Sequence, residues 1–534
     1  MKKTLFILTL IFMIAGRISG QSGFDYTLEL IPVSIPGLPG LHSYAFGQHE
    51  GKWLVIGGRK DGLHARQPFN AFPESQNNTD IYVIDINSQQ FWTGSVNVLP
   101  VGIREQLQST NMNFYQDHDT LYIVGGYAFS PTADDHITFP NLTSINVSET
   151  INSIMNGNPI SPFFKQITDG NFAVTGGQLG KIGNVFYLVG GQRFDGRYNP
   201  MGNPTYTQTY SDKIRKFTLD NSGSQLSYAE YTTITDPIHL RRRDYNLLPQ
   251  IFPDGTEGYT ISSGVFQLDT DLPFLYPVDI NENRYSPVTN FNQYLSNYHS
   301  AKSCLYDSVN NRMHTIFFGG MSQYFYDDGI LMQDNNVPFV KTISLLTRSA
   351  DSSLAEFQLP LEMPHFSGAS AEFIPNYSLP HYPSEIIKLS RISDNAFIIG
   401  HVYGGIYSPS MNPFTINQTN TTSADTIIYA VKLTNNSPVG IQKIDGKNPY
   451  SMKIFPNPTI SEISFELNDE LPADSHYFIT NTSGQIIDTG DLKSTEAGSK
   501  RYQIRIDSRT RNQTVFLTVV ILNKYFITSK VILK

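Results

Sequence analysis

The chain is poor in cysteine, tryptophan and long apolar segments. Among its 534 residues there are one cysteine, Cys304, and two tryptophans. A single cysteine excludes an internal disulfide, so packing and sheet hydrogen bonds must hold the fold together, and we expect Cys304 to be a buried thiol. Beyond the amino-terminal region no stretch approaches 18 uninterrupted apolar residues, so we expect no transmembrane anchor.

Basic charge is also in deficit, and metal-binding motifs are missing. The chain has 38 Lys and Arg against 47 Asp and Glu, a net charge of −9. A mildly acidic surface argues against nucleic acid or anionic lipid as the main partner. There is no His-Glu-x-x-His motif, no Cys-x-x-Cys pair and no EF-hand loop, and Asp327-Asp328 and Asp334-Asn-Asn336 are typical of solvated turns. We therefore expect no metal and no cofactor.

Strand-forming and turn-forming residues are abundant, with 34 Phe, 30 Tyr, 40 Gly and 31 Pro, a composition typical of an all-β protein. Six times between residues 53 and 405, a short run of β-branched and aromatic residues ends in two small residues. These pairs are Gly57-Gly58, Gly125-Gly126, Gly190-Gly191, Ser263-Gly264, Gly319-Gly320 and Gly404-Gly405. Such repetition predicts a radial β architecture. The glycines are expected where blades crowd, because a Cβ would obstruct positive φ or close backbone approach.

The first repeat contains the pattern of a complete four-stranded blade. Strands are expected at residues 41–46, 52–56 and 80–85, and a fourth begins at Gln90-Phe-Trp92. This order resembles the kelch repeat, in which a glycine pair follows the second strand and a Trp marks the fourth. The resemblance implies a six-bladed kelch-like β-propeller over residues 21–434. Because the fourth copy is weak, counts of five or seven blades stay open.

Spacing and chain ends add two expectations about the ring. The second small residues of successive pairs lie 56 to 85 residues apart, whereas kelch units run to about 50. The extra residues should form long loops, for example 59–78 and 193–209, where binding often resides. The last blade lacks an outer strand, and residues 26–31 alternate suitably to supply it and close the ring. The alternative is that this segment is an export spacer.

Polar residues at the starts of the inner strands are the first candidates for a ligand site, because these strands line the central channel of a propeller. The candidates are His42, Arg104, Gln178, Arg242, Arg243, Asp244, His299 and His365. Arginine forks bind carboxylates, and aromatic rings stack on sugar faces, so an anionic or hydroxyl-rich glycan is one ligand class, with a protein ligand as another. The alternative is that these residues bind neighbouring blades and channel water.

Catalysis in the channel stays open as an alternative. Galactose-oxidase-like propellers need two His, two Tyr and a Cys for copper, and here only Tyr298, His299 and Cys304 cluster. A sialic-acid mutarotase-like activity, found in another kelch propeller, would use channel residues such as Arg104, Glu105, Arg242 and His365. Glycoside cleavage needs paired carboxylates at a defined separation. We expect a binding or interaction protein, with a carbohydrate-active enzyme as the alternative.

The amino terminus predicts export. Lys2 and Lys3 precede an apolar run over residues 5–15, and Ile18-Ser-Gly20 supplies the small residues that a signal peptidase needs. We expect residues 1–20 to be a signal peptide.

The carboxy-terminal region predicts a second, smaller domain. A polar linker at 435–450 precedes residues 451–534, whose short alternating strands favour an immunoglobulin-like β-sandwich. Its motifs contain Phe455, Pro456, Asn457, Pro458, Gly484, Lys530 and Lys534. Over about 85 residues the segment resembles the type A C-terminal sorting domain of the Bacteroidetes type IX secretion system.

That resemblance implies a partner and a destination. The module would be an address for the outer-membrane translocon, so the protein would pass through the periplasm to the cell surface or the medium. The segment departs from the family at Asn512-Gln-Thr-Val-Phe516, where Gly-x-Tyr is usual. The alternative is an ordinary immunoglobulin-like module that binds sugar or packs on the propeller.

Overall fold

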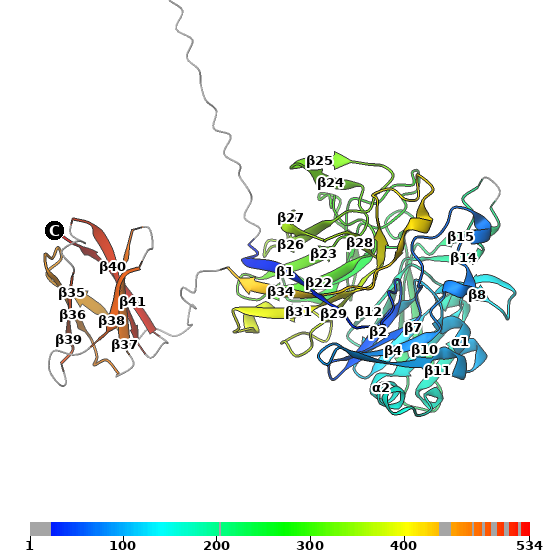
Figure 1. Ribbon diagram of the computed structural model, residues 1–534, viewed down its shortest axis with the longest axis horizontal. Helices are drawn as coiled ribbons and strands as arrows, with labels where there is room; N and C mark the ends of the chain where they lie inside the picture. Colours follow the sequence, from blue (N-terminus) through cyan, green and yellow to red (C-terminus); the bar gives the residue numbers. More distant parts are fainter. Residues whose placement is uncertain are drawn as a thin grey trace, which may run out of the picture. The chain divides into compact units, whose positions relative to one another are not determined.

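The computed structural model describes residues 23–436 and 450–534, except for 202–203, 473–474, 483–485, 493–498, 507–511 and 522–524 (Figure 1). The chain divides into two compact units, Met1–Asn436 and Ser437–Lys534. The expected signal peptide at 1–20, most of the expected linker at 435–450, and Gly484 lie outside the described residues. No helix in the described part of the chain is long and apolar enough to cross a membrane.

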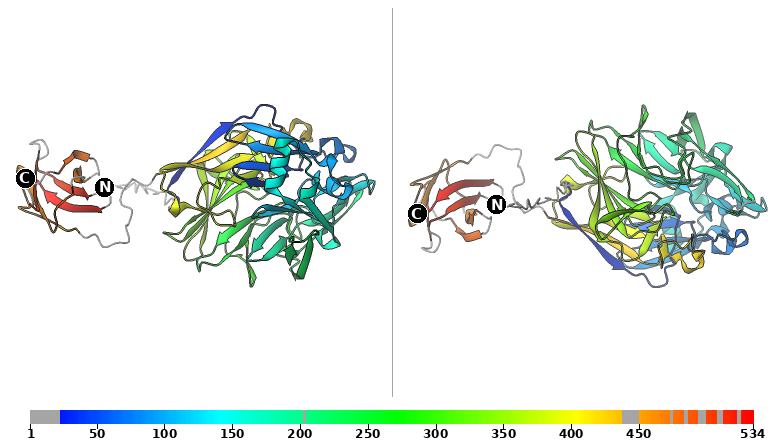
Figure 2. Two further views of the ribbon diagram at one scale, coloured as in Figure 1. Left: turned by 90° about the horizontal axis from the view of Figure 1, so that it is seen from below. Right: turned by 90° about the horizontal axis from the view of Figure 1, so that it is seen from above.

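The first unit is a β-propeller, and the six sheets that form its blades lie around a common centre (Figure 2). Blade one has β2 (Ala45–His49), β3 (Lys52–Ile56), β4 (Asp80–Asp85) and β5 (Gln90–Ser95); blade two has β6 (Asn113–Asp117), β7 (Thr120–Val124), β10 (Asn141–Asn146) and β11 (Phe164–Thr168). Blade three has β12 (Gln178–Ile182), β13 (Val185–Val189), β16 (Lys213–Asp220) and β17 (Ser227–Thr235); blade four has β18 (Asn246–Ile251), β19 (Glu257–Ser262), β20 (Val278–Asn281) and β21 (Tyr285–Pro287). The weak fourth copy is therefore a true blade.

The last two blades carry the irregular features of the ring. Blade five has β22 (Ala301–Asp307), β23 (Arg312–Phe318), β26 (Thr342–Arg348) and β27 (Leu354–Glu362), with β30 (Ile387–Lys388) added parallel to β22. Blade six has β29 (Glu372–Pro375), β31 (Ala396–Tyr403), β34 (Ile428–Asn435) and β1 (Tyr26–Val33). Strand β1 pairs antiparallel with β34, from Tyr26 opposite Asn435 to Val33 opposite Ile428. The first described strand thus supplies the outer strand of the last blade.

The paired small residues bind one blade to the next. All six second glycines have φ between 79° and 96°, and Ser263 adopts φ 41° where the other blades have glycine. Each second glycine donates its N–H to a carbonyl at the start of the following blade, at 2.7 to 3.1 Å. The acceptors are Ser109, Val174, Arg242, Asn297, Ser367 and Leu41. A Cβ on Gly125 would lie 1.8 Å from the Val174 carbonyl oxygen, so close approach as well as positive φ demands glycine there.

The propeller has two ends, which we name after the connections that lie there. The loop end is where each inner strand begins and each glycine pair lies; the hairpin end is where inner strands turn into second strands. Insertions at the loop end form β8 (Tyr127–Ser130) with β9 (Asp135–Thr138), β14 (Gln192–Gly196) with β15 (Tyr206–Tyr210), β24 (Tyr324–Asp327) with β25 (Ile330–Gln333), and β28 (Phe366–Ala369) with β32 (Ile406–Ser408) and β33 (Ser423–Ala424). The α-helices are α1 (Val101–Leu107) and α2 (Val147–Asn156) within the described residues.

The second unit consists of two sheets that share one core. One sheet has β35 (Met452–Ile454), β36 (Glu462–Leu467) and β39 (Arg501–Arg505). The other has β38 (Ile486–Asp491), β37 (Ser475–Asn481), β40 (Thr514–Ile521) and β41 (Tyr525–Ile532). Alternate residues such as Ile463, Phe465, Leu517 and Val519 fill the space between the sheets, as expected of a β-sandwich with one wet face on each sheet.

Candidate functional site

The channel is encircled at the loop end by a closed ring of backbone hydrogen bonds. The ring residues, which we call the axial ring, are Ser43, Asn111, Gly176, Asp244, His299 and Ser370. Each N–H donates to the carbonyl of the ring residue in the preceding blade, at 2.7 to 3.2 Å, and the ring closes from Ser43 to Ser370. Two of the predicted channel residues, Asp244 and His299, belong to it.

Charged side chains meet at the axial ring but leave little space. The Arg243 guanidinium pairs with the Asp244 carboxylate, and His299 Nε2 lies 3.1 Å from Glu372 Oε1. The opening among Ser43, Asn111, Asp244, His299 and Glu372 measures about 10 Å³, close to the minimum for one water molecule. Gln178 also lines this opening. The polar cluster expected from the sequence exists here, but the cavity around it is far smaller than a sugar.

Two predicted channel residues do not lie on inner strands. Arg104 lies on helix α1, and the inner strand of blade two is β6, which begins at Asn113. The spacing of the buried residues Ile103 and Leu107 is the helical i, i+4 spacing, which explains the error. His365 is exposed and precedes β28, whereas the inner strand of blade six is β29. The sequence interpretation was wrong for both placements.

Two further predicted residues are buried among protein partners. His42 is 5% exposed, with Nδ1 3.0 Å from Ser43 Oγ and Nε2 3.7 Å from Asp61 Oδ1. Arg242 is fully buried and donates to the carbonyls of His239, Ser263 and Tyr276 at 2.6 to 2.9 Å. Its guanidinium also lies over the rings of Phe274 and Tyr276. Arg242 therefore ties blade four together, which matches the alternative stated for these residues.

A second polar cluster lies beside the axial ring at the loop end. Arg241 and Arg243 both lie over the ring of Tyr210, with guanidinium carbons 3.8 and 6.0 Å from its centroid. Arg243 Nε also donates to the Tyr210 hydroxyl at 3.1 Å. The two guanidinium groups could bind a carboxylate by donating hydrogen bonds in the fork geometry typical of arginine.

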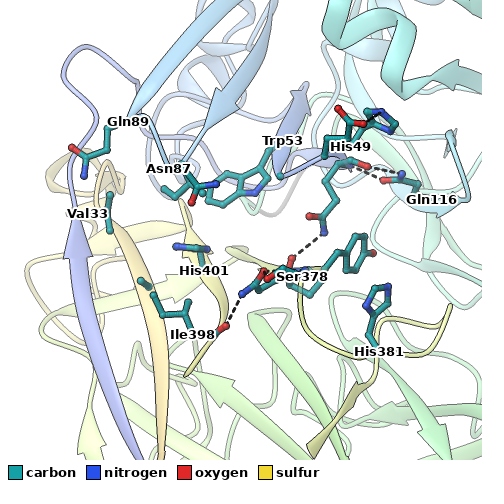
Figure 3. A pocket seen from close by; sticks show the side chains of 18 of the residues that line it. Val33, His49, Trp53, Asn87, Gln89, Gln116, Ser378, His381, Ile398 and His401 are labelled. Carbon is teal, nitrogen blue, oxygen red and sulfur yellow. Dashed lines mark hydrogen bonds and ion pairs between the residues drawn. The ribbon is translucent and has the colours of Figure 1, made fainter. Parts of the chain in front are cut away.

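A large cavity lies at the hairpin end of the propeller, between blades six and one (Figure 3). We call it the groove; its volume is about 1040 Å³. The turns after β2, β4 and β6 form one side, and the segment 375–383 forms another. The walls carry Ile31, Val33, Trp53, Ile398 and His401.

Packing explains why the groove lies at this junction. Between blades one and two, Val147, Ile151 and Ile154 of helix α2 fill the hairpin end as part of one core cluster. Between blades six and one, a core cluster that includes Leu41 and Tyr403 packs toward the loop end. In the described part of the chain no helix occupies the hairpin end of this second junction. The junction between blades six and one, where the ring closes, is therefore packed at the loop end and open at the hairpin end.

Hydrogen-bonded amides fix the inner end of the groove. Gln48 N–H donates to Gln116 Oε1 at 2.7 Å, and Gln116 Nε2 donates back to the Gln48 carbonyl at 2.9 Å. Gln48 Nε2 reaches the Pro375 carbonyl at 3.1 Å, and Asn376 Nδ2 reaches the Ile398 carbonyl at 2.9 Å. These bonds join three blades, so the polar floor is held in one arrangement.

Four of the chain's 12 histidines line the groove: His49, His118, His381 and His401. The His401 ring lies 5.2 Å from Trp53, and burial lowers its pKa to about 4, so the imidazole is neutral at pH 7. His381 stacks on Tyr377 at 4.5 Å, with Nδ1 2.8 Å from the Leu379 carbonyl oxygen. His49 and His118 instead lie beside Asp119 and Asp117.

The groove therefore presents amides, imidazoles and aromatic rings, together with the acidic side chains of Glu50 and Asp117. Its lining, which belongs wholly to the described residues, includes no Lys or Arg. Among the described residues, no group of three or more His, Cys, Asp or Glu is placed to hold a metal ion. Sequence reasoning missed this site. The available signals were Trp53 and His401, the one tryptophan and the one histidine within the second strands of blades one and six.

Hydrogen bonds within the sandwich join the motif at residues 455–458 to the terminal segment at residues 530–534. Asn457 Nδ2 donates to the Lys530 carbonyl, and Asn457 Oδ1 accepts from Ile532 N–H, both at 2.9 Å. Pro456 and Pro458 are exposed on either side of Asn457, and Phe455 lies under the Arg501 guanidinium. Lys534 N–H donates to the Thr459 carbonyl at 2.9 Å, and the side chains of Lys530 and Lys534 are exposed.

Comparisons with known proteins give a likeness in structure and no match in sequence. No protein-family model matches the chain, and no curated protein sequence matches it. A solved structure titled "Structure of YjhT" is similar with a TM-score of 0.41 and 11% sequence identity, over 76% of this chain and 99% of that one.

Proposed function

We propose that the protein is an exported binding protein that holds a neutral, hydroxyl-rich ligand, such as part of an oligosaccharide, in the groove. The observation that carries this proposal is a cavity of about 1040 Å³ whose lining combines amides, imidazoles and aromatic rings. Ligand sites commonly occupy about 300 to 1,000 Å³ and place a few polar groups among apolar walls. The groove has that size and that mixture.

The chemistry of the lining favours hydroxyl groups over charged groups. The amides of Asn87 and Gln89 are exposed at the outer end, and each can both donate and accept. His401 adds a neutral imidazole beside Trp53. An anionic ligand would find no Lys or Arg in this lining, which lies within the described residues. A sugar hydroxyl is served by each of these groups without a buried unpaired charge.

A blocking variant tests the location. Ser378 is exposed in the groove, and its N–H and hydroxyl both bind Asn376 Oδ1. Ser222 is also exposed, and it binds Asp220 in the same manner on the β16–β17 turn. We expect Ser378→Trp to abolish binding of residues 21–534 to neutral oligosaccharides on a glycan array, and Ser222→Trp to leave it unchanged. Equal binding by both variants would exclude the groove.

We propose further that residues 451–534 are the export address for a type IX secretion system. The motif resemblance supports this proposal, as does the independent core of the module. Removal of residues 437–534 should trap the propeller in the periplasm, whereas the full chain should reach the cell surface or the medium. Immunoblots of the fractions provide the measurement, and equal export of both proteins would contradict the proposal.

A second candidate function is the processing of an acidic sugar at the loop end. The specific observation is the pair Arg241 and Arg243 around Tyr210, beside Asp244 and the contact between His299 and Glu372. If this reading holds, turnover or binding of sialic acid should be lost in Arg243→Leu and retained in Ser378→Trp. Ser378→Trp thus distinguishes the two candidate functions, because it should abolish binding of a neutral oligosaccharide and leave binding or turnover of sialic acid intact.

A further inference from the structure

A small chamber occupies the channel between the axial ring and the hairpin end. Its volume is about 90 Å³, and its lining includes Tyr115, Gln178, Lys302, Glu372, Ser384 and Glu385. The segment 376–386 leaves blade six after β29 and reaches β30 on blade five. It supplies Ser384 and Glu385 to the chamber lining. The chamber therefore has room for several water molecules.

Lys302 contributes the one ammonium group to this chamber lining. Among the described residues, no carboxylate lies within 4.0 Å of its Nζ and no hydrogen bond joins it to another group. The two acidic side chains are engaged elsewhere. Glu372 lies 3.1 Å from His299, and Glu385 accepts from the Tyr377 hydroxyl at 2.8 Å. Lys302 is half-buried and lacks a close counter-ion from the described chain, whereas charges in protein interiors are normally paired.

A neutral donor in the chamber is also unsatisfied. Ser384 Oγ is buried and has no hydrogen-bond partner among the described residues. Burial raises the pKa of Glu385, whose carboxyl also faces Lys302, Glu372 and His381. The other titratable groups that line the chamber are Tyr115, Tyr259, whose hydroxyl binds the backbone of Lys181, and the buried thiol of Cys304.

We infer that the chamber binds a small monovalent anion, of the size of chloride, between Lys302 Nζ and Ser384 Oγ. The anion supplies the counter-charge that Lys302 lacks and accepts the hydrogen bond that Ser384 offers. It lies on the channel axis and holds the crossing segment 376–386 against β22 of blade five. This role is structural and independent of any ligand in the groove.

Bromide replacement tests the inference directly. Crystals of the full chain grown in sodium bromide should show an anomalous peak that contacts Lys302 Nζ and Ser384 Oγ. Anomalous density at the surface alone, or a chamber filled only with water, would overturn the inference.

A solution measurement accompanies the crystal. The melting temperature of the full chain should rise by several degrees when sodium gluconate is replaced by sodium bromide at constant ionic strength. The rise should vanish in Lys302→Met and in Lys302→Gln, and it should persist in Lys341→Met, because Lys341 lies over the Phe366 ring outside the chamber. An equal rise in wild type and both Lys302 variants would contradict the proposed site.

Discussion

At the loop end of the propeller, backbone hydrogen bonds join all six blades in the axial ring, and a second set joins each glycine pair to the following blade. At the hairpin end, blades six and one separate and leave a groove of about 1040 Å³. The first arrangement uses backbone groups, which every residue possesses, so it repeats around the ring. The second depends on which side chains or insertions fill one junction. The comparison teaches that repetition supplies the rigid frame, while an irregularity in packing supplies the binding space.

The largest effect is expected from steric disruption of the loop end. Gly125 has φ 66°, and Gly125→Ala places a Cβ 1.8 Å from the Val174 carbonyl oxygen. We expect this substitution to lower the free energy of unfolding by about 4 kcal/mol. Gly183 has φ 58° and no atom within 4 Å of an added Cβ, so Gly183→Ala should cost about 1 kcal/mol. Urea unfolding followed by tryptophan fluorescence measures both, since Trp53 and Trp92 lie in blade one. If both variants lost the same free energy of unfolding, the close approach of Gly125 to the Val174 carbonyl would contribute nothing to the cost.

The next largest effect is expected from a comparison of the filled junction between blades one and two with the open junction between blades six and one. Ile151 of α2 is 2% exposed between blades one and two, whereas Ile398 in the groove wall is 36% exposed. Ile151→Ala should cost about 3 kcal/mol through loss of burial and the cavity left behind. Ile398→Ala should cost less than about 1 kcal/mol because little buried surface is lost. If the two variants unfolded at the same urea concentration, the hairpin ends of the two junctions would be equally packed.

Acid should weaken both ends through neutral histidines. Burial lowers to about 4 the pKa of His64, whose ring packs against Phe72 and Tyr198 at the loop end, and the pKa of His401 in the groove. The unfolded chain binds these protons near pH 6.5, so the stability that each neutral imidazole contributes is present above that pH. It is lost as the pH falls toward 4, by about 2 kcal/mol for each residue.

NMR titration of the two imidazoles measures this directly. Both should stay neutral until about pH 4, and a neutral oligosaccharide that binds should shift the His401 resonance and leave His64 unchanged. His401→Gln and His64→Gln should each reduce the dependence of stability on pH. A midpoint near 6.5 for either imidazole would contradict its burial.

The smallest effect concerns the strand pair that closes the ring beside the groove. Lys432 Nζ on β34 lies 3.0 Å from Glu29 Oε2 on β1, and both side chains are partly exposed. We expect Glu29→Lys to cost about 0.5 kcal/mol, since exposed ion pairs contribute little. The exchange Glu29→Lys with Lys432→Glu should restore the loss. A loss of several kcal/mol would mean that closure depends on this pair rather than on the β1–β34 hydrogen bonds.

The sequence predicts the repeated parts of the molecule well, because their causes are local. The glycine pairs and the strand alternation at residues 26–31 indicate blades and their closure without knowledge of distant contacts. The predicted position of the inner strand in blade two was wrong because helix α1 and its Arg104 stand where the other blades have a short connection. The groove was missed because it depends on α2 filling one junction while another is left open. That choice is set by contacts between residues far apart in the chain.

One measurement tests the central claim that the groove is the binding site. Trp53 lines the groove, whereas Trp92 packs against the core between blades one and two. In the Trp92→Phe protein, Trp53 is the sole tryptophan and reports on the groove alone. Titration with a neutral oligosaccharide that binds on the array should change its fluorescence saturably, and Ser378→Trp should prevent that oligosaccharide from binding to the array. Unchanged Trp53 fluorescence at concentrations that saturate binding on the array would place the ligand elsewhere.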